Sequence, residues 1–239
     1  WEQLVISRTK APAAYGAGDS ALALASFETS LASPMLPAAD RRLILETTIK
    51  LAVQMKDMAR AARWLKSYIS EGGNDPALRQ MYPQVLGLTG DHAAAVTEAK
   101  VIVQANDAAG KPSSDALLRS LGASANAIKD EASYQFALEH LVVSSPRPDY
   151  WADLISRVAR RPGFADERLR LDTYRLMQAV GVELEGEEFV EIAERAQQAG
   201  QPIEALKALD SAKTRGLLGP IKNQAGLAKL RDQVGTLAG

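Results

Sequence analysis

The sequence predicts an all-α fold, an α-solenoid of stacked helix–turn–helix hairpins, and three observations support this prediction. Apolar residues recur at steps of three and four along most of the chain, which places them on one face of successive helices. Alanine, a strong helix former, is abundant. Turn signals also return at a regular interval, since Lys56 lies 38 residues after Gly18, Gly90 lies 34 residues after Lys56, and Lys129 lies 39 residues after Gly90. A period in the thirties indicates an array of repeats.

The N-terminal half is expected to form three hairpins. Its first helix carries Leu4 and Val5 on its apolar face, and Pro12 should bend that helix or end its first part. Asp19 is a good N-cap for the second helix, because its carboxylate can accept a hydrogen bond from a backbone N–H of the first turn. We place these repeats at residues 1–34, 38–73 and 75–107.

Residues 115–148 form the best-defined predicted hairpin. Its polar turn is Lys129–Glu131, and Pro146 ends it because proline cannot continue a helix. Each helix of this hairpin has apolar residues on one face. In the first helix they are Leu118, Leu121, Ala125 and Ile128, and in the second Tyr134, Leu138, Leu141 and Val142.

The C-terminal part predicts two further hairpins, at residues 149–181 and 187–217, and a last helix at 221–237. The second helix of the first of these hairpins should bury Leu169, Thr173, Leu176, Met177 and Val180. We expect residues 1–239 to form a single superhelical domain, because stacked repeats bury a continuous core.

Composition and charge narrow the classes of partner. The 239 residues are 46% hydrophobic and 24% charged, as in an ordinary globular protein. Lys and Arg number 28 against 29 Asp and Glu, so no nucleic-acid partner is expected through bulk positive charge. No apolar run approaches the ~20 residues of a membrane-spanning helix, so no transmembrane segment is expected in this fragment. The chain starts at Trp1 rather than at methionine, which suggests a fragment or a processed product.

The predicted central hairpin resembles a tetratricopeptide repeat (TPR) position by position. Counted from Asp115, the bulky residues at positions four and seven and the small residue at position eight are Leu118, Leu121 and Gly122, and the proline at position 32 is Pro146. Tyr134 departs from the family, which usually has alanine there, and its size predicts a wider separation of the two helices. The resemblance extends over nearly the whole chain.

The resemblance implies a non-catalytic scaffold that binds a protein or peptide partner in the concave groove of a superhelix. Groove-facing positions of the first helices are, by this register, Glu46, Lys50, Arg119, Asn126, Ser156, Glu194 and Gln197. The family's clamp for C-terminal carboxylates does not map onto this sequence. The stretches YWADLISRVARRPGFADERLRLDTYRLM, EGGNDPALR and AGQPIEALKALD are similar to exported proteobacterial TPR proteins, which implies a periplasmic or cell-envelope location.

The sequence offers little framework for catalysis. His92 and His140 lie 48 residues apart, there is no cysteine and no HExxH motif, and so neither a metal nor a cofactor is expected. Both histidines are interpreted as structural, near a helix start and near a helix end. The alternative to a scaffold is an enzymatic or small-ligand module of the cell envelope, acting on polysaccharide in the concave pocket.

A cluster of arginines is a second candidate site for an anionic partner. It includes Arg157, Arg160 and Arg161, and continues with Arg168, Arg170 and Arg175. Such a cluster can hold phosphate or carboxylate groups by bidentate hydrogen bonds. We prefer the interpretation of a solvated face, because Asp166, Glu167 and Asp172 alternate with the arginines at helix-pair spacing.

Overall fold

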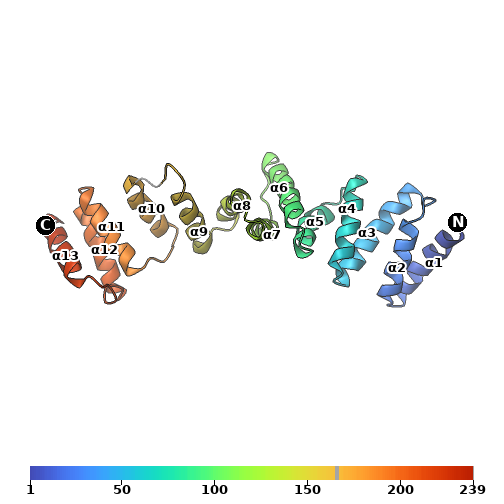
Figure 1. The fold of residues 1–239 in the computed structure, drawn as a ribbon, viewed down its shortest axis with the longest axis horizontal. Helices are drawn as coiled ribbons and strands as arrows, with labels where there is room; N and C mark the ends of the chain where they lie inside the picture. Colours follow the sequence, from blue (N-terminus) through green and yellow to red (C-terminus); the bar gives the residue numbers. More distant parts are fainter. Residues whose placement is uncertain (165–166, 239) are drawn as a thin grey trace. The chain divides into compact units, whose positions relative to one another are not determined.

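The computed structural model describes residues 1–164 and 167–238, with the side chains of 167, 168 and 238 excepted. The described residues form thirteen helices and no strand, which confirms the all-α prediction (Figure 1). They divide into two compact units, Trp1–His140 and Leu141–Gly239, and the division falls within α8.

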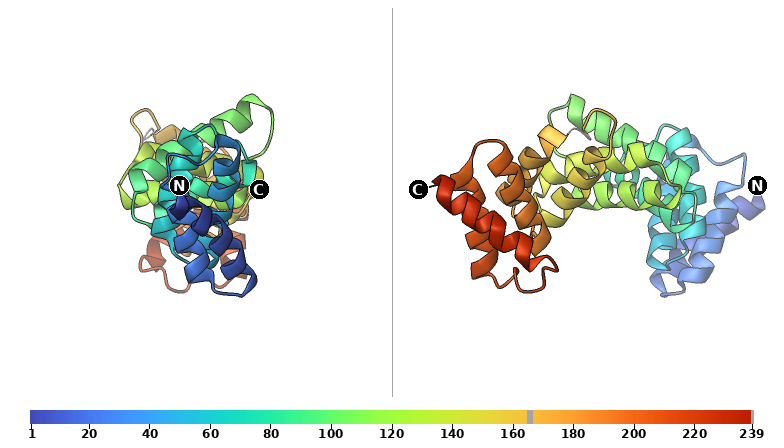
Figure 2. Two further views of the ribbon diagram at one scale, coloured as in Figure 1. Left: turned by 90° about the vertical axis from the view of Figure 1, so that its right-hand side faces the viewer. Right: turned by 60° about the vertical axis from the view of Figure 1, so that its left-hand side comes forward.

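Unit 1 is a series of helical hairpins. The pairs are α1 (Glu2–Gly16) with α2 (Ser20–Leu31), α3 (Ala38–Gln54) with α4 (Met58–Ser70), α5 (Pro76–Leu88) with α6 (His92–Ala108), and α7 (Asp115–Ala127) with α8 (Glu131–Ser144). From α1 to α7 each helix packs against the next one in the chain, and α5 also packs against α7. Figure 2 gives two further views of these hairpins. Contacts between neighbours therefore build the core, as expected for a helical repeat.

The four hairpin turns of unit 1 share one conformation. Each contains a residue in the left-handed region, with φ of 80° at Gly18, 60° at Lys56, 87° at Gly90 and 58° at Lys129. The next residue is always an aspartate whose side chain accepts a hydrogen bond from a backbone N–H of the second helix, at 3.0 Å for Asp19, Asp57 and Asp130 and 3.2 Å for Asp91. The predicted Asp19 cap is confirmed, and the spaced turns are structurally equivalent.

Unit 2 continues with five helices. They are α9 (Pro148–Ala159), α10 (Glu167–Ala179), α11 (Gly186–Gln198), α12 (Pro202–Thr214) and α13 (Gln224–Ala238). Each packs against its neighbour in the chain, and the most buried large side chains, Phe189, Ile192 and Leu209, come from α11 and α12. The core of this unit is thus centred on the α11–α12 hairpin.

The sequence left open whether Pro12 bends the first helix or ends its first part, and α1 continues through Pro12 to Gly16. Two details of the predicted elements are wrong. Val5 and Ile128 were expected on inward faces, but they are 42% and 43% exposed. Ile128 is the residue after the last turn of α7, so the helical periodicity no longer fixes its direction.

The inward face of α10 also differs from the prediction. Leu171 and Tyr174 are buried, whereas Leu169 and Leu176 are 37% and 42% exposed. Both sets have helical spacing, so the apolar pattern alone does not distinguish them. The hydroxyl of Tyr174 donates to Glu191 of α11 at 2.5 Å, and this contact orients α10.

Tyr134 of α8 faces Gly122 of α7. A methyl group at Gly122 would lie 3.7 Å from Cβ of Ala137 and 3.9 Å from the ring of Tyr134, which is ordinary van der Waals contact, so the two helices leave room for a methyl group at this point. The wider separation of the two helices that the size of Tyr134 predicts stays a prediction.

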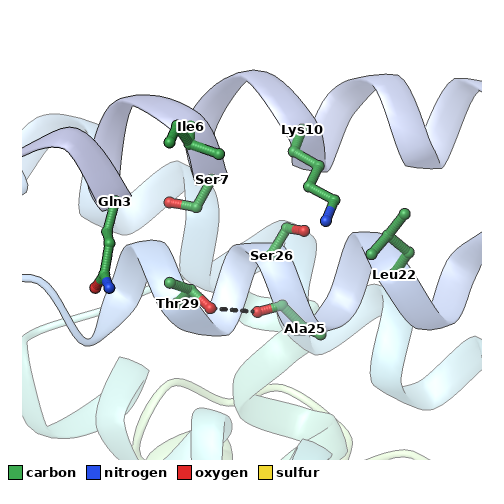
Figure 3. Close-up of a pocket in the computed structure, with 8 residues that line it drawn as sticks. All are labelled: Gln3, Ile6, Ser7, Lys10, Leu22, Ala25, Ser26 and Thr29. Atoms are coloured by element: carbon green, nitrogen blue, oxygen red, sulfur yellow. Dashed lines mark hydrogen bonds between the residues drawn. The ribbon is translucent and has the colours of Figure 1, made fainter.

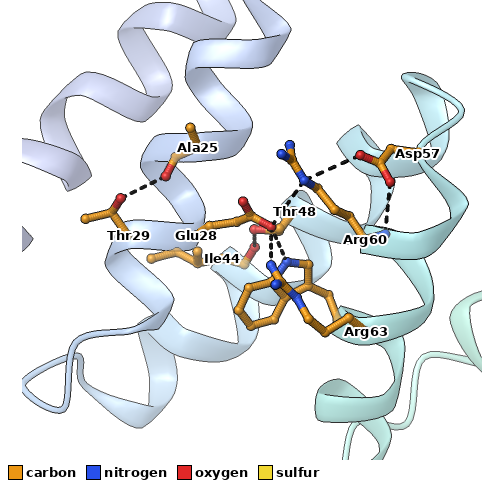
Figure 4. Close-up of polar contacts among 9 residues, drawn as sticks. Ala25, Glu28, Thr29, Ile44, Thr48, Asp57, Arg60 and Arg63 are labelled. Atoms are coloured by element: carbon orange, nitrogen blue, oxygen red, sulfur yellow. Dashed lines mark hydrogen bonds and ion pairs between the residues drawn. The ribbon is translucent and has the colours of Figure 1, made fainter.

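A polar contact joins the second helices of the first two hairpins. Glu28 of α2 accepts a hydrogen bond from Nε1 of Trp64 at 2.8 Å and pairs with Arg63 at 2.5 Å, both from α4. Figure 4 shows Arg60 approaching the same carboxylate from α4, at 3.9 Å. Because the Glu28 side chain is only 18% exposed, these partners satisfy a charge that would otherwise be costly to bury.

The predicted packing of the central hairpin can be tested at Leu121, which is 1% exposed and shares the core with Leu138. Leu121→Ala is expected to lower the free energy of unfolding by about 2–5 kcal/mol, through lost apolar burial and the cavity left behind. Chemical denaturation followed by circular dichroism measures this loss. Val101→Ala is the control, since Val101 is 57% exposed on α6. Equal, small losses for both variants would show that Leu121 is not a core residue.

Candidate functional site

A pocket lies between α5 and α7, the first helices of neighbouring hairpins in unit 1. Its volume is about 430 Å³, and its lining residues are Gln84, Gly87, Leu88, His92, Ala116, Arg119, Ser120, Ala123 and Ser124. Arg119 is one of the predicted groove residues, and the other helices that contribute are α5 and the first turn of α6. The lining is therefore mixed: one charged arginine, several hydroxyl and amide groups, and an apolar part around Leu88.

The pocket lies beside a contact between α5 and α7 at Gly87. A Cβ atom at position 87 would lie 2.9 Å from Oγ of Ser124, so this rotatable hydroxyl would have to move. Gly87 and Ser124 therefore mark a place where the two helices lie close together. The pocket is a consequence of the helix packing within unit 1.

Arg119 is exposed and has no carboxylate partner among the described residues. Four other arginines of unit 1 do have one: Arg8 pairs with Asp40, Arg41 with Glu71, and both Arg60 and Arg63 with Glu28. Arg42, like Arg119, is exposed and has no carboxylate partner among the described residues. None of the described residues that line the pocket is acidic. The guanidinium of Arg119 is therefore available to an anionic group from outside the chain.

His92 contributes a second unusual group to the pocket lining. It is the first residue of α6 and is partly buried, and its Nδ1 atom is shielded from solvent without a hydrogen-bond partner among the described residues. An unsatisfied buried polar atom typically costs about 1–3 kcal/mol. The expectation that His92 stands at a helix start is met, but its place in a pocket with an unsatisfied nitrogen was not predicted.

His140, the other histidine, has partners at both ring nitrogens. Nδ1 lies 2.8 Å from the carbonyl oxygen of Phe136, and Nε2 lies 3.0 Å from a carboxylate oxygen of Asp107 on α6. Burial opposes the charged form, but these hydrogen bonds and the negative charges of Asp107 and Glu139 outweigh it and raise the pKa of His140. His140 therefore links α8 to α6 and is distinct from His92 in its environment.

The other predicted groove residues of unit 1 lie on α3 and α7. Glu46 is half-buried and accepts a hydrogen bond at 3.0 Å from the hydroxyl of Tyr68, which in turn accepts one from the backbone N–H of Asp75. Lys50 and Asn126 are exposed. Glu46 thus helps to fix the turn before α5, whereas Lys50, Arg119 and Asn126 extend into solvent.

The predicted groove residues of unit 2 lie on α9 and α11. Ser156 is half-buried and accepts a hydrogen bond from Arg160 at 2.8 Å. Glu194 is exposed and Gln197 is half-buried. The structure places Ser156 and Arg160 in contact.

Several arginines of the predicted cluster are paired within the chain. Arg157 pairs with Asp153 at 2.7 Å and its side chain is only 19% exposed, while Arg161 is exposed. Arg175 pairs with Glu204 at 2.5 Å and with Asp172 at 2.7 Å, and it also donates to Gln201. Asp166 and the side chains of Glu167 and Arg168 lie outside the described residues. Much of the positive charge is thus balanced locally, as in the solvated-face interpretation.

Glu191 is the centre of a polar network in unit 2 that sequence reasoning missed. It accepts from Tyr174 at 2.5 Å and pairs with Arg195 at 2.7 Å and Arg170 at 3.0 Å. Burial disfavours the carboxylate, but the hydrogen bonds from Tyr174 and Arg195 and the neighbouring positive charges hold the pKa of Glu191 below its ordinary value. Its partner Tyr174 is 17 residues away in the sequence, so no local pattern indicates it.

A second pocket of about 320 Å³ lies between α1 and α2. Figure 3 shows Ser7 and Lys10 of α1 extending toward α2, opposite Ser26. Ser7 shares a 2.8 Å hydrogen bond with Ser30, so part of this polar surface is already satisfied. No predicted groove residue lines it, and we regard the α5–α7 pocket as the stronger candidate.

Two further searches covered only the described part of the chain. Within residues 1–164 and 167–238, no group of three or more His, Asp or Glu side chains is arranged to hold a metal ion. No helix in these ranges is both long and apolar enough to cross a membrane.

No protein family model and no curated protein sequence matches the chain. Among solved structures it is similar to a segment of MamA from Desulfovibrio magneticus RS-1, with 14% identity over 83% of this chain and 97% of that one and a TM-score of 0.45. It is also similar to a tetratricopeptide repeat protein from Parabacteroides merdae ATCC 43184, with 12% identity, coverage of 98% and 99%, and a TM-score of 0.43. The all-α helical repeat fold rests on the helix order and the turns of the chain itself.

The raised pKa of His140 predicts how the α6–α8 contact responds to pH. We expect NMR titration to give His140 a pKa above the ordinary value of about 6.5, and Asp107→Asn to lower it. Because the folded-state pKa exceeds that of the unfolded chain, the stabilisation is complete below about pH 6.5 and is lost as pH rises through the folded pKa. An unchanged titration of His140 in the Asp107→Asn variant would contradict the contact.

The network around Glu191 predicts a larger loss of stability than its position on the surface of α11 suggests. Glu191→Ala should lower the free energy of unfolding by about 1–3 kcal/mol, since it removes the acceptor of the buried Tyr174 hydroxyl and an ion-pair partner of Arg170 and Arg195. Glu194→Ala on the same helix is the control and should change it by less than about 0.5 kcal/mol. Denaturant titration at neutral pH compares the two variants, and similar losses would mean that the network is not stabilising.

Proposed function

We propose that the chain is a non-catalytic scaffold that binds a segment of a protein partner along its first helices. The observation that carries this proposal is the pocket between α5 and α7, which combines an apolar part, hydroxyl and amide groups, and an arginine without a carboxylate partner among the described residues. A mixed surface of this kind suits a peptide, because a peptide presents apolar side chains and hydrogen-bonding groups together.

The packing of unit 1 supports a preformed binding surface. Leu117, Leu118 and Leu121 of α7 are buried, so the helix is fixed by its inward face while Arg119 and Asn126 remain outside the core. Binding to such a surface requires little ordering of the scaffold, which lowers the entropic cost of association. We further propose a periplasmic or cell-envelope location, on the sequence resemblance alone.

A peptide library displayed on phage and selected on the full chain tests the binding function directly. We expect selected peptides to bind with moderate affinity, and the double variant Arg119→Ala/Asn126→Ala to weaken binding about tenfold, because it removes groups that can donate hydrogen bonds to the peptide. Circular dichroism should show an unchanged fold, since neither side chain is buried. Calorimetry on the selected peptides measures the affinity.

The matched comparison is Arg157→Ala/Arg160→Ala on α9 and its C-terminal end. If this variant abolishes binding while Arg119→Ala/Asn126→Ala does not, the arginine cluster is the binding site and the first-helix proposal fails. If no peptide is selected but an envelope polysaccharide binds saturably, the ligand-binding alternative replaces the scaffold.

A further inference from the structure

The pocket between α5 and α7 brings together two groups that the packing of unit 1 leaves unsatisfied. One is the exposed guanidinium of Arg119, which has no carboxylate partner among the described residues. The other is Nδ1 of His92, which is shielded from solvent and has no hydrogen-bond partner within the same described ranges. The two residues come from different helices, α7 and α6, and line one pocket.

From this arrangement we propose that the pocket anchors an acidic side chain, Asp or Glu, of the partner segment. Its carboxylate pairs with Arg119, and an apolar neighbour in the segment packs on Leu88. The inference rests on the proposed scaffold function and specifies the chemistry of one contact. It accounts for the positive charge of the pocket, whose described lining contains one arginine and no acidic residue.

The lining suits a single carboxylate. Arg119 presents a planar guanidinium, which binds a carboxylate through two parallel hydrogen bonds. Ser120 lies one residue further on α7, and Gln84 lies one turn before Leu88 on α5, so uncharged donors surround a single positive charge. A segment that runs past the pocket and inserts one carboxylate satisfies this set, while Leu88, which is 63% exposed, offers apolar contact beside it.

His92 lines the same pocket, so its imidazole reports on binding there. Its Nδ1 atom is shielded from solvent, and the proposed carboxylate contact is made by Arg119 alone.

The experiment uses the full chain and three short peptides as probes. These are acetyl-Leu-Glu-amide, its uncharged counterpart acetyl-Leu-Gln-amide, and acetyl-Leu-Gln with a free C-terminal carboxylate. NMR titration of backbone and imidazole resonances gives the affinities. We expect the Glu peptide to bind about fivefold more tightly than the Gln amide, the range of an ion pair at an exposed site, and the free-terminus peptide to be weaker than the Glu peptide.

Two arginine variants separate the pocket from general positive charge. Arg119→Ala should remove the preference for Glu, whereas Arg42→Ala, at another exposed arginine of unit 1, should retain it. The imidazole resonances of His92, which lines the pocket, should shift on addition of the Glu peptide. That of His140 should not, because both of its nitrogens already have protein partners.

Each outcome is decisive for the acidic anchor. Equal affinity for the Glu and Gln amides, an unchanged preference in Arg119→Ala, or no saturable binding of any probe at millimolar concentration overturns it. Stronger binding of the free-terminus peptide assigns the site to a chain end and overturns the side-chain proposal. Unchanged His92 resonances during saturable binding of the Glu peptide place the peptide outside this pocket and overturn the proposal as well. The library selection decides separately whether the surface binds peptides, so the scaffold can stand when the acidic anchor fails.

Discussion

The folding of unit 1 depends on a turn in which one aspartate closes one helix and opens the next. At Asp19, Asp57, Asp91 and Asp130 the backbone N–H donates to the carbonyl oxygen five residues earlier, at 2.9–3.0 Å. This bond terminates the first helix around a residue with positive φ, in the arrangement of a Schellman motif. The side chain of the same aspartate then caps the second helix. The end of one helix and the start of the next are therefore both fixed at this residue.

Glycine and lysine alternate at the left-handed position of this turn. Glycine adopts positive φ without a steric penalty, whereas a lysine there costs about 1–2 kcal/mol. Lys56 and Lys129 have φ of 60° and 58°, so the aspartate that caps the second helix and the backbone hydrogen bonds hold them in this conformation. In unit 2 the corresponding turn before α12 has Gly200 followed by Gln201, which makes no side-chain cap. The hairpin of that unit instead relies on the packing of α11 against α12.

Local signals of this kind were readable from the sequence, and contacts between distant residues were not. The spacing of Gly18, Lys56, Gly90 and Lys129 predicted the hairpins of unit 1 because each turn is built from consecutive residues. The predicted inward face of α10 was wrong because α10 has two sets of apolar residues with the same helical spacing. Which set is buried depends on the contact of Tyr174 with Glu191 on another helix. The contact between Glu28 and Trp64 spans 36 residues and likewise left no local pattern.

The candidate site likewise combines features that the sequence predicts with features that only the folded chain reveals. Arg119 could be placed on a first-helix surface by its position in the repeat, but the lack of a carboxylate beside it became evident only in the folded chain. The pocket lies where α5 packs against α7, and this contact pairs residues 37 positions apart, Gly87 and Ser124, across a hairpin boundary. The stacking of hairpins thus places side chains of different helices, such as Arg119 and His92, in the lining of one pocket. The repeat pattern predicts the helices that carry these side chains, whereas their grouping follows from how α5, α6 and α7 pack.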